Sequence, residues 1–139
     1  MEVLVALGAE DLHRLAEAAR RLERRISFSE YLLHHQFTRL EDGYFAKTSP
    51  PQLIQLIEKD GQCYYINHAM NGDSGRLMEF IMHRLSPNGK IIPLYGIRIS
   101  ELLTAVDIAR LYVQDVSRVN KKGGTTKANL RKKKGGSRP

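Results

Sequence analysis

The sequence has little cysteine and no long apolar run, and each absence excludes a class of protein. Cys63 is the single cysteine among 139 residues, so the chain can form neither an internal disulfide nor a cysteine-based zinc cluster. No stretch approaches the roughly 20 apolar residues that a membrane-spanning helix needs. Residues 1–8 contain no basic residue, which argues against a secretory signal. We therefore expect a cytoplasmic protein with no membrane partner.

Motifs for metal binding and catalysis are also missing. The sequence contains no HExxH pattern, and the adjacent His34 and His35 would point about 100° apart on a helix. No pair of carboxylates suggests acid–base catalysis, and no neighbour in the sequence would activate Cys63. We predict no metal and no cofactor, and the sequence favours a non-enzymatic protein. His34, His35 and His68 remain the candidates for a general base if the protein is an enzyme.

Acidic residues are absent from the C-terminal segment 120–139, which holds eight of the 22 basic residues. The other residues include 14 basic and 15 acidic ones, so the pI of about 9.7 reflects this segment alone. The segment has one leucine and no aromatic residue, too little apolar surface to offset the entropy lost on ordering. The sequence therefore predicts a single domain at 1–119 and a disordered basic tail at 120–139.

The basic tail suggests a polyanionic partner. Lysines on a glycine-rich chain neutralise phosphates and release counterions without contacting base edges. The leading hypothesis is an accessory protein that binds DNA or RNA electrostatically through this tail. The alternative is a protein–protein adaptor whose tail only keeps it soluble. The candidate nucleic-acid-binding residues of the tail are Lys121, Lys122, Lys127, Arg131, Lys132, Lys133, Lys134 and Arg138.

A second basic surface is expected on the first helix. Apolar residues recur at three- and four-residue steps between residues 10 and 26, which is typical of an amphipathic helix. Arg14, Arg21 and Arg25 fall within about 40° of one another on the opposite side. They could contact a phosphate backbone, or they could form a solvated face paired with Glu10 and Glu17.

The remaining pattern predicts an α+β fold, with helices packed on a small antiparallel or mixed sheet. Asp60 and Gly61 between two apolar runs indicate a hairpin, although residues 51–59 could instead form a short helix. Ser27 and Ser100 are expected to cap helices. The expected helices cover residues 10–26, 27–40, 76–85 and 100–119, and the expected strands cover residues 2–6, 44–47, 53–58, 62–67 and 90–99.

A small-residue loop at 71–76 follows a strand and opens a helix. Backbone N–H groups at such a place can bind phosphate or pyrophosphate. The loop position and the order of elements over residues 44–119 resemble those of GNAT-type acetyltransferases and of the toxin-activating lysine acyltransferases. The resemblance implies an acyltransferase that holds a thioester cofactor on Gly72, Ser74, Gly75 and Arg76. The same loop also suits a tight turn in which Asp73 or Ser74 caps the next helix.

Two further surfaces could bind partners. Tyr64 and Tyr65 are adjacent on a strand, so one ring should face the core and the other should face outward, where it could stack on a base. Ile108, Leu111 and Tyr112 lie off the main apolar stripe of the last helix and could contact a protein partner or a second copy of the chain.

Overall fold

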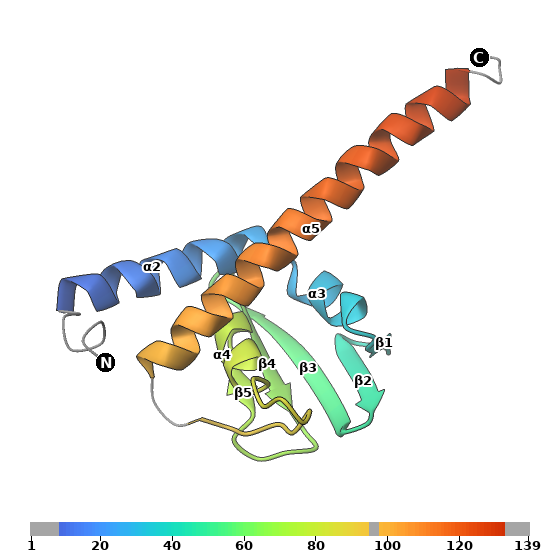
Figure 1. Cartoon of the computed structure of the whole chain (residues 1–139). Helices are drawn as coiled ribbons and strands as arrows, with labels where there is room; N and C mark the ends of the chain where they lie inside the picture. The colour runs from blue at the N-terminus through green and yellow to red at the C-terminus, as the bar shows by residue number, and fades with distance from the viewer. Residues whose placement is uncertain (1–8, 95–97, 133–139) are drawn as a thin grey trace. The chain divides into compact units, whose positions relative to one another are not determined.

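The computed structural model of the chain describes residues 9–94 and 98–132, with the backbone alone at residue 9 and at 119–132. It forms two compact units, residues 1–108 and residues 109–139. The strand predicted at 2–6 lies outside the described residues. The elements are α2 (Ala9–Arg25), α3 (Phe28–His34), β1 (Thr38–Arg39), β2 (Tyr44–Thr48), β3 (Pro51–Lys59), β4 (Gln62–Asn67), β5 (Ser74–Gly75), α4 (Leu77–Met82) and α5 (Ile99–Lys132) (Figure 1).

The predicted α+β fold is confirmed, and its sheet is antiparallel. Five strands pair in the order β1-β2-β3-β4-β5, so each strand lies beside its neighbours in the sequence. Residues 51–59 form β3, and the alternative prediction of a helix there is wrong. The hairpin between β3 and β4 turns at Asp60 and Gly61, which have φ values of 54° and 74°. Two positive φ values are typical of a type I′ turn, whose twist matches that of the flanking strands.

One face of the sheet carries the core. Phe45 pairs with Ile54 across β2 and β3, and both are almost fully buried. Tyr65 of β4 lies on the same face and is 1% exposed, whereas Tyr64 points to the other face and is half-buried. The predicted inward and outward orientation of the two tyrosines is therefore confirmed.

Aromatic rings join the helices to this face. Phe80 of α4 lies 5.1 Å from Tyr65 and 5.4 Å from Phe28 of α3, measured between ring centroids. Phe37 packs against the other side of the cluster at 6.1 Å from Phe80. Edge-to-face and tilted ring pairs of this kind add to the free energy gained by burying the rings. The cluster fixes α3 and α4 on the sheet.

The second helix is shorter than predicted. The Oγ of Ser27 accepts a hydrogen bond from the backbone N–H of Glu30, so the predicted cap is confirmed. However, α3 ends at His34, and the predicted continuation to residue 40 is wrong. Gln36 has a φ of 72°, which is incompatible with a helix, and the chain then pairs Thr38 with Ala46 of β2. Pairing with the sheet edge takes precedence over the local helical pattern.

The segment before the last helix also differs from the prediction. Residues 90–94 form no strand, and residues 95–97 lie outside the described part of the chain. Pro93 has no N–H to donate to a ladder, and Ile92 donates its N–H to the carbonyl of His83. The last helix begins at Ile99, so Ser100 lies within its first turn and does not cap it. Its hydroxyl instead donates to Glu101.

The last helix extends farther than its apolar pattern indicates. Leu102 and Val106 are buried, as the predicted stripe requires. The backbone of α5 continues to Lys132, past the predicted end near Val119. The disorder predicted for residues 120–139 and the domain boundary after residue 119 stay predictions.

Candidate functional site

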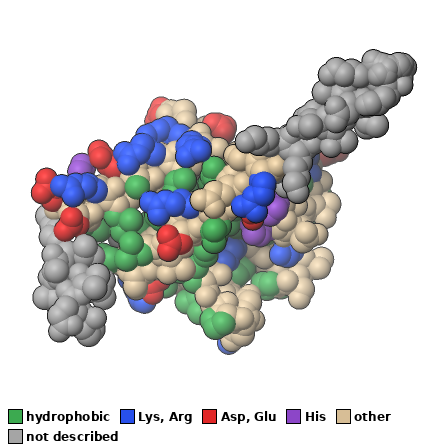
Figure 2. All heavy atoms as spheres, turned by 45° about the horizontal axis from the view of Figure 1, so that its top comes forward, with side chains coloured by type: hydrophobic (Ala, Val, Ile, Leu, Met, Phe, Trp, Pro, Cys, Tyr) green, Lys and Arg blue, Asp and Glu red, His purple; other side chains and the backbone are tan. Residues whose placement is uncertain are grey.

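Basic side chains gather along α2. Figure 2 shows Lys and Arg over this helix, with acidic side chains mainly toward its N-terminal end. Arg14 forms ion pairs with Glu10 and Asp11, so its charge is largely compensated. Arg21 and Arg25, the other two candidates on this helix, are exposed. Neither forms an ion pair with another residue of the described chain.

Arg24 joins Arg21 and Arg25 as an exposed arginine near the end of α2. Arg20 is instead tied to acidic groups, with its guanidinium 2.7 Å from Glu23 and 3.5 Å from Glu79. The available positive charge is therefore concentrated in the last turn and a half of the helix. We call Arg21, Arg24 and Arg25 the α2 arginines.

The predicted basic tail lies mostly within the part of α5 whose backbone alone is described. Lys121, Lys122, Lys127, Arg131 and Lys132 belong to α5, and Lys133, Lys134 and Arg138 lie outside the described residues. On the partner surface predicted for this helix, Leu111 is 59% exposed. Ile108 and Tyr112 are half-buried.

The 71–76 loop is held by buried contacts. Asp73 is 1% exposed, and its carboxylate accepts hydrogen bonds from Tyr65, Asn67 and Arg84. Ser74 and Gly75 form β5, which pairs with β4. Neither Asp73 nor Ser74 caps the next helix, because the N-cap residue of α4 is Arg76.

Carboxylates already occupy the start of α4. Glu79 accepts a hydrogen bond from the backbone N–H of Arg76 at 3.0 Å, and Glu23 accepts one from Met78 at 3.0 Å. A pyrophosphate bound there would meet two negative charges. At Gly75, an added Cβ would also lie 2.8 Å from the Cβ of Glu79. These contacts favour a structural role for Gly72, Ser74, Gly75 and Arg76.

A polar network around Asp73 is the feature that the sequence did not reveal. The guanidinium of Arg84 makes five hydrogen bonds, to Asp73, Gln52 and the carbonyl of Phe80. It therefore uses its full set of N–H donors within the protein. His83 is 3% exposed, and its Nδ1 lies 3.1 Å from Asp73 Oδ1. Although burial opposes ionisation, the hydrogen bonds from His83 and Arg84 hold the pKa of Asp73 well below its usual range.

The other histidines and the cysteine show no catalytic arrangement. His34, His35 and His68 are exposed. The ring of His35 is nevertheless partly shielded from water, and this partial desolvation, with the neighbouring His34 and Lys47, lowers its pKa. No group of three metal-ligating side chains comes together in residues 9–94 and 98–132. Within the same residues, no helix is long and apolar enough to cross a membrane.

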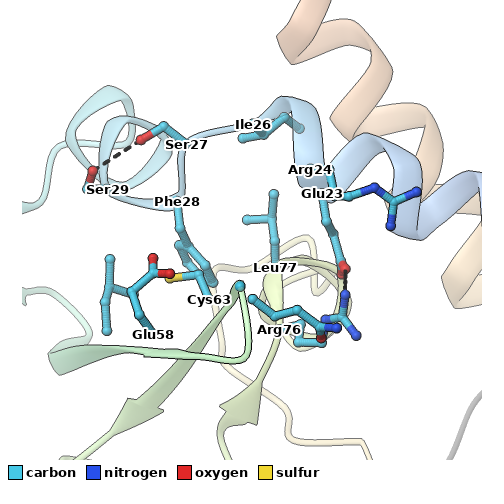
Figure 3. Close-up of a pocket in the computed structure, with 13 residues that line it drawn as sticks. Glu23, Arg24, Ile26, Ser27, Phe28, Ser29, Glu58, Cys63, Arg76 and Leu77 are labelled. Carbon is cyan, nitrogen blue, oxygen red and sulfur yellow. Dashed lines mark hydrogen bonds and ion pairs between the residues drawn. The ribbon is translucent and has the colours of Figure 1, made fainter.

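A cavity of about 470 Å³ opens beside the α2 arginines. Figure 3 shows Glu58, Cys63 and Phe28 on one side of it and Glu23, Arg24 and Arg76 on the other. It lies at one end of the core face of the sheet, where Glu58 of β3 pairs with Cys63 of β4. We call this the hairpin cavity. Its lining also includes Ile26, Ser27, Ser29, Leu56, Gly61, Gln62 and Leu77.

Glu23 is the buried carboxylate in the lining of the hairpin cavity. Its side chain is 7% exposed, and Oε2 accepts hydrogen bonds from Arg20 and Met78. Arg76 Nη2 lies 3.1 Å from Oε1, but no group in the described chain donates a hydrogen bond to this atom. The cation of Arg76 therefore compensates the charge of this buried carboxylate.

Cys63 should react slowly despite lining the hairpin cavity. Burial, together with the nearby carboxylate of Glu58, raises the pKa of its thiol from 9.0 to about 11. The thiolate is the reactive species, and each pKa unit lowers its fraction about tenfold near neutral pH. We expect iodoacetamide at pH 8 to alkylate Cys63 about 100-fold more slowly than an unperturbed thiol of equal access. Alkylation of Cys63 as fast as that of glutathione would contradict the raised pKa of its thiol.

Comparison with known proteins identifies no relative. No family model, no curated protein and no solved structure matches this chain.

Proposed function

We propose that the protein is a non-enzymatic accessory protein that binds nucleic acid electrostatically. The observation that carries the proposal is the segregation of charge, with eight basic and no acidic residues at 120–139. Such a segment gains affinity for any phosphate backbone by releasing counterions. The cytoplasm is the compartment we propose for it.

The α2 arginines support the proposal as a second phosphate contact. They are exposed and form no ion pair among the described residues, whereas Arg14 and Arg20 are already paired with acids. Phosphate contacts made by exposed arginines orient a nucleic acid without specifying its sequence. No observation favours the acyltransferase hypothesis to the same degree, because carboxylates occupy the start of α4.

The proposal is tested by binding measurements across a salt series. Fluorescence anisotropy of labelled duplex DNA, single-stranded DNA and RNA would be recorded with the full chain. We expect binding to all three, with log K falling linearly as log salt concentration rises. Absence of binding near physiological salt would overturn the proposal and leave the adaptor hypothesis.

Replacing Arg21, Arg24 and Arg25 together by glutamine should weaken binding to every sequence to a similar extent. Each lost phosphate contact should reduce the salt slope by about 0.9 for duplex DNA. The matched control is Arg14→Gln, because that arginine is already paired with Glu10 and Asp11. If the control weakens binding as much per charge as the triple variant, the α2 arginines have no special role.

A further inference from the structure

A second cavity, of about 300 Å³, opens where α3, β2, β3, α4 and α5 meet. All of its lining residues belong to the unit formed by residues 1–108, and none of them lines the hairpin cavity. We call it the Lys47 cavity, and its walls include Lys47, His35, Phe37, Phe80, Ile91 and Ile108. Its volume is at the lower end of the range in which proteins bind small molecules.

Most of the wall of the Lys47 cavity is apolar. Phe37, Phe80 and Ile91 are buried, and Ile108 is half-buried. The rings of Phe37 and Phe80 lie 6.1 Å apart, measured between their centroids. Apolar surface of this kind is stabilised when an apolar ligand replaces water. The cavity therefore suits a ligand with an apolar body.

The ammonium group of Lys47 lies at this apolar wall. Its Nζ donates a hydrogen bond to the backbone carbonyl of His35 at 3.0 Å and lies 5.3 Å from the centroid of the Phe37 ring. His35 and Phe37 both line the cavity, so their contacts place the charge beside it. An ammonium group has three N–H donors. Within the described chain one of them is used, and two remain for a ligand.

The charge of Lys47 is not compensated by an acid. The lining contributed by the described residues contains no Asp or Glu, and Lys47 forms no ion pair among these residues. Arg84 also lines the cavity, but its charge is paired with Asp73 and its five N–H donors are all used. Lys47 is thus the cation that can attract a ligand of opposite charge.

We propose that the Lys47 cavity binds a small apolar monocarboxylate, whose carboxylate accepts hydrogen bonds from the two remaining N–H groups of Lys47. The apolar body of the ligand lies against Phe37 and Phe80. One ammonium group compensates one negative charge, whereas a phosphate group carries about −1.5 to −2 charges at pH 7. A carboxylate therefore matches this site better than a phosphate, and the site is independent of nucleic-acid binding.

The test is a calorimetric titration of the full chain with octanoate and with 1-octanol at neutral pH. The two probes share one apolar chain and differ in charge. We expect octanoate to bind about tenfold more tightly or better, because a hydrogen-bonded ion pair with Lys47 adds at least about that factor. Equal affinities, or no binding of octanoate at millimolar concentration, would overturn the proposal.

Lys47→Met is the informative variant, since it removes the charge and keeps an unbranched apolar side chain beside Phe37. Its affinity for octanoate should fall about tenfold, while its affinity for 1-octanol stays unchanged because the apolar wall is intact. Lys59→Met is the matched control, because Lys59 is exposed and does not line the cavity. It should bind octanoate as the natural chain does.

Three results with these variants would contradict the carboxylate contact. They are natural octanoate affinity in Lys47→Met, an equal loss for both probes in that variant, and an equal loss of octanoate affinity in the Lys59→Met control. Ile108→Trp tests the location separately, because a larger side chain at this wall should fill the cavity and weaken octanoate and 1-octanol together. Natural affinity of Ile108→Trp for both probes would show that they bind elsewhere and would overturn the proposal.

Discussion

Replacing Asp73 by alanine should lower the free energy of unfolding by about 3–5 kcal/mol, the usual loss when one partner of a buried ion pair is removed. The side chain of Asp73 is fully buried, and that of Arg84 is only 17% exposed. Without the carboxylate, the guanidinium keeps its charge in a region that excludes water. Tyr65 and Asn67 lose the acceptor of their hydrogen bonds as well. Urea denaturation followed by circular dichroism would measure the loss.

Two further variants distinguish lost charge from lost packing. Asp73→Asn keeps the shape and should still be strongly destabilised, since the charge of Arg84 remains uncompensated. Combining it with Arg84→Met removes both charges and should recover part of the stability. The control Glu41→Ala changes an exposed carboxylate and should shift stability by less than about 0.5 kcal/mol. An Asp73→Asn variant as stable as this control would show that the pair contributes nothing.

The same carboxylate makes stability depend on pH. The pKa of Asp73 is lowered in the folded chain, so the unfolded chain binds more protons than the folded one in acid. Its contribution is complete above the unfolded pKa of about 3.9 and is lost as the pH falls toward the folded value. The Asp73→Asn variant should therefore lose less stability than the natural chain between about pH 4 and pH 2. Equal acid sensitivity of the two chains would contradict this assignment.

Neutralising the basic tail should reduce affinity for duplex DNA at least about 100-fold near physiological salt. The variant replaces all eight lysines and arginines of residues 120–139 by glutamine. Each phosphate contact that is lost removes about 0.9 from the slope of log K against log salt concentration. The affinity and the slope should therefore fall together, and anisotropy across a salt series measures both.

The matched control for the tail keeps its charge. Replacing Lys121, Lys122, Lys127 and the run Lys132–Lys134 by arginine changes the side chains but preserves every positive charge. Counterion release depends on charge, so this control should bind nearly as the natural chain does. If the glutamine variant retains the natural salt slope, the tail is not the binding element and the adaptor hypothesis gains support.

Local patterns predicted the β3–β4 hairpin and α2 closely. The hairpin follows from Asp60 and Gly61 between two strand-forming runs, and Gln62–Asn67 was predicted without error. The helix at Ala9–Arg25 follows from a stripe of apolar residues, of which Ala19 and Leu22 are buried. These elements are determined by neighbouring residues, so the sequence shows them directly.

Elements whose ends depend on distant residues were predicted less well. Helix α3 stops at His34 because the following residues pair with β2, and this strand pairing is not visible in the local pattern. The strand predicted at 90–99 is absent from its described part, because Ile92 bonds to His83 instead of to a neighbouring strand. The sequence also could not show which arginines are paired with acids. Arg14 and Arg21 lie on the same side of the helix, but only Arg14 forms ion pairs.

By itself, the sequence determined the α+β class, the hairpin, the first helix and the concentration of positive charge at 120–139. These properties follow from composition and from contacts between near neighbours. Tertiary structure alone decided that Arg84 meets both Asp73 and Gln52, and that Glu23 and Glu58 border one cavity. These residues come from different helices, strands and loops, and only packing on one face of the sheet brings them together. Because these residues lie far apart in the sequence, no local pattern predicts the Arg84 network or the lining of the cavity.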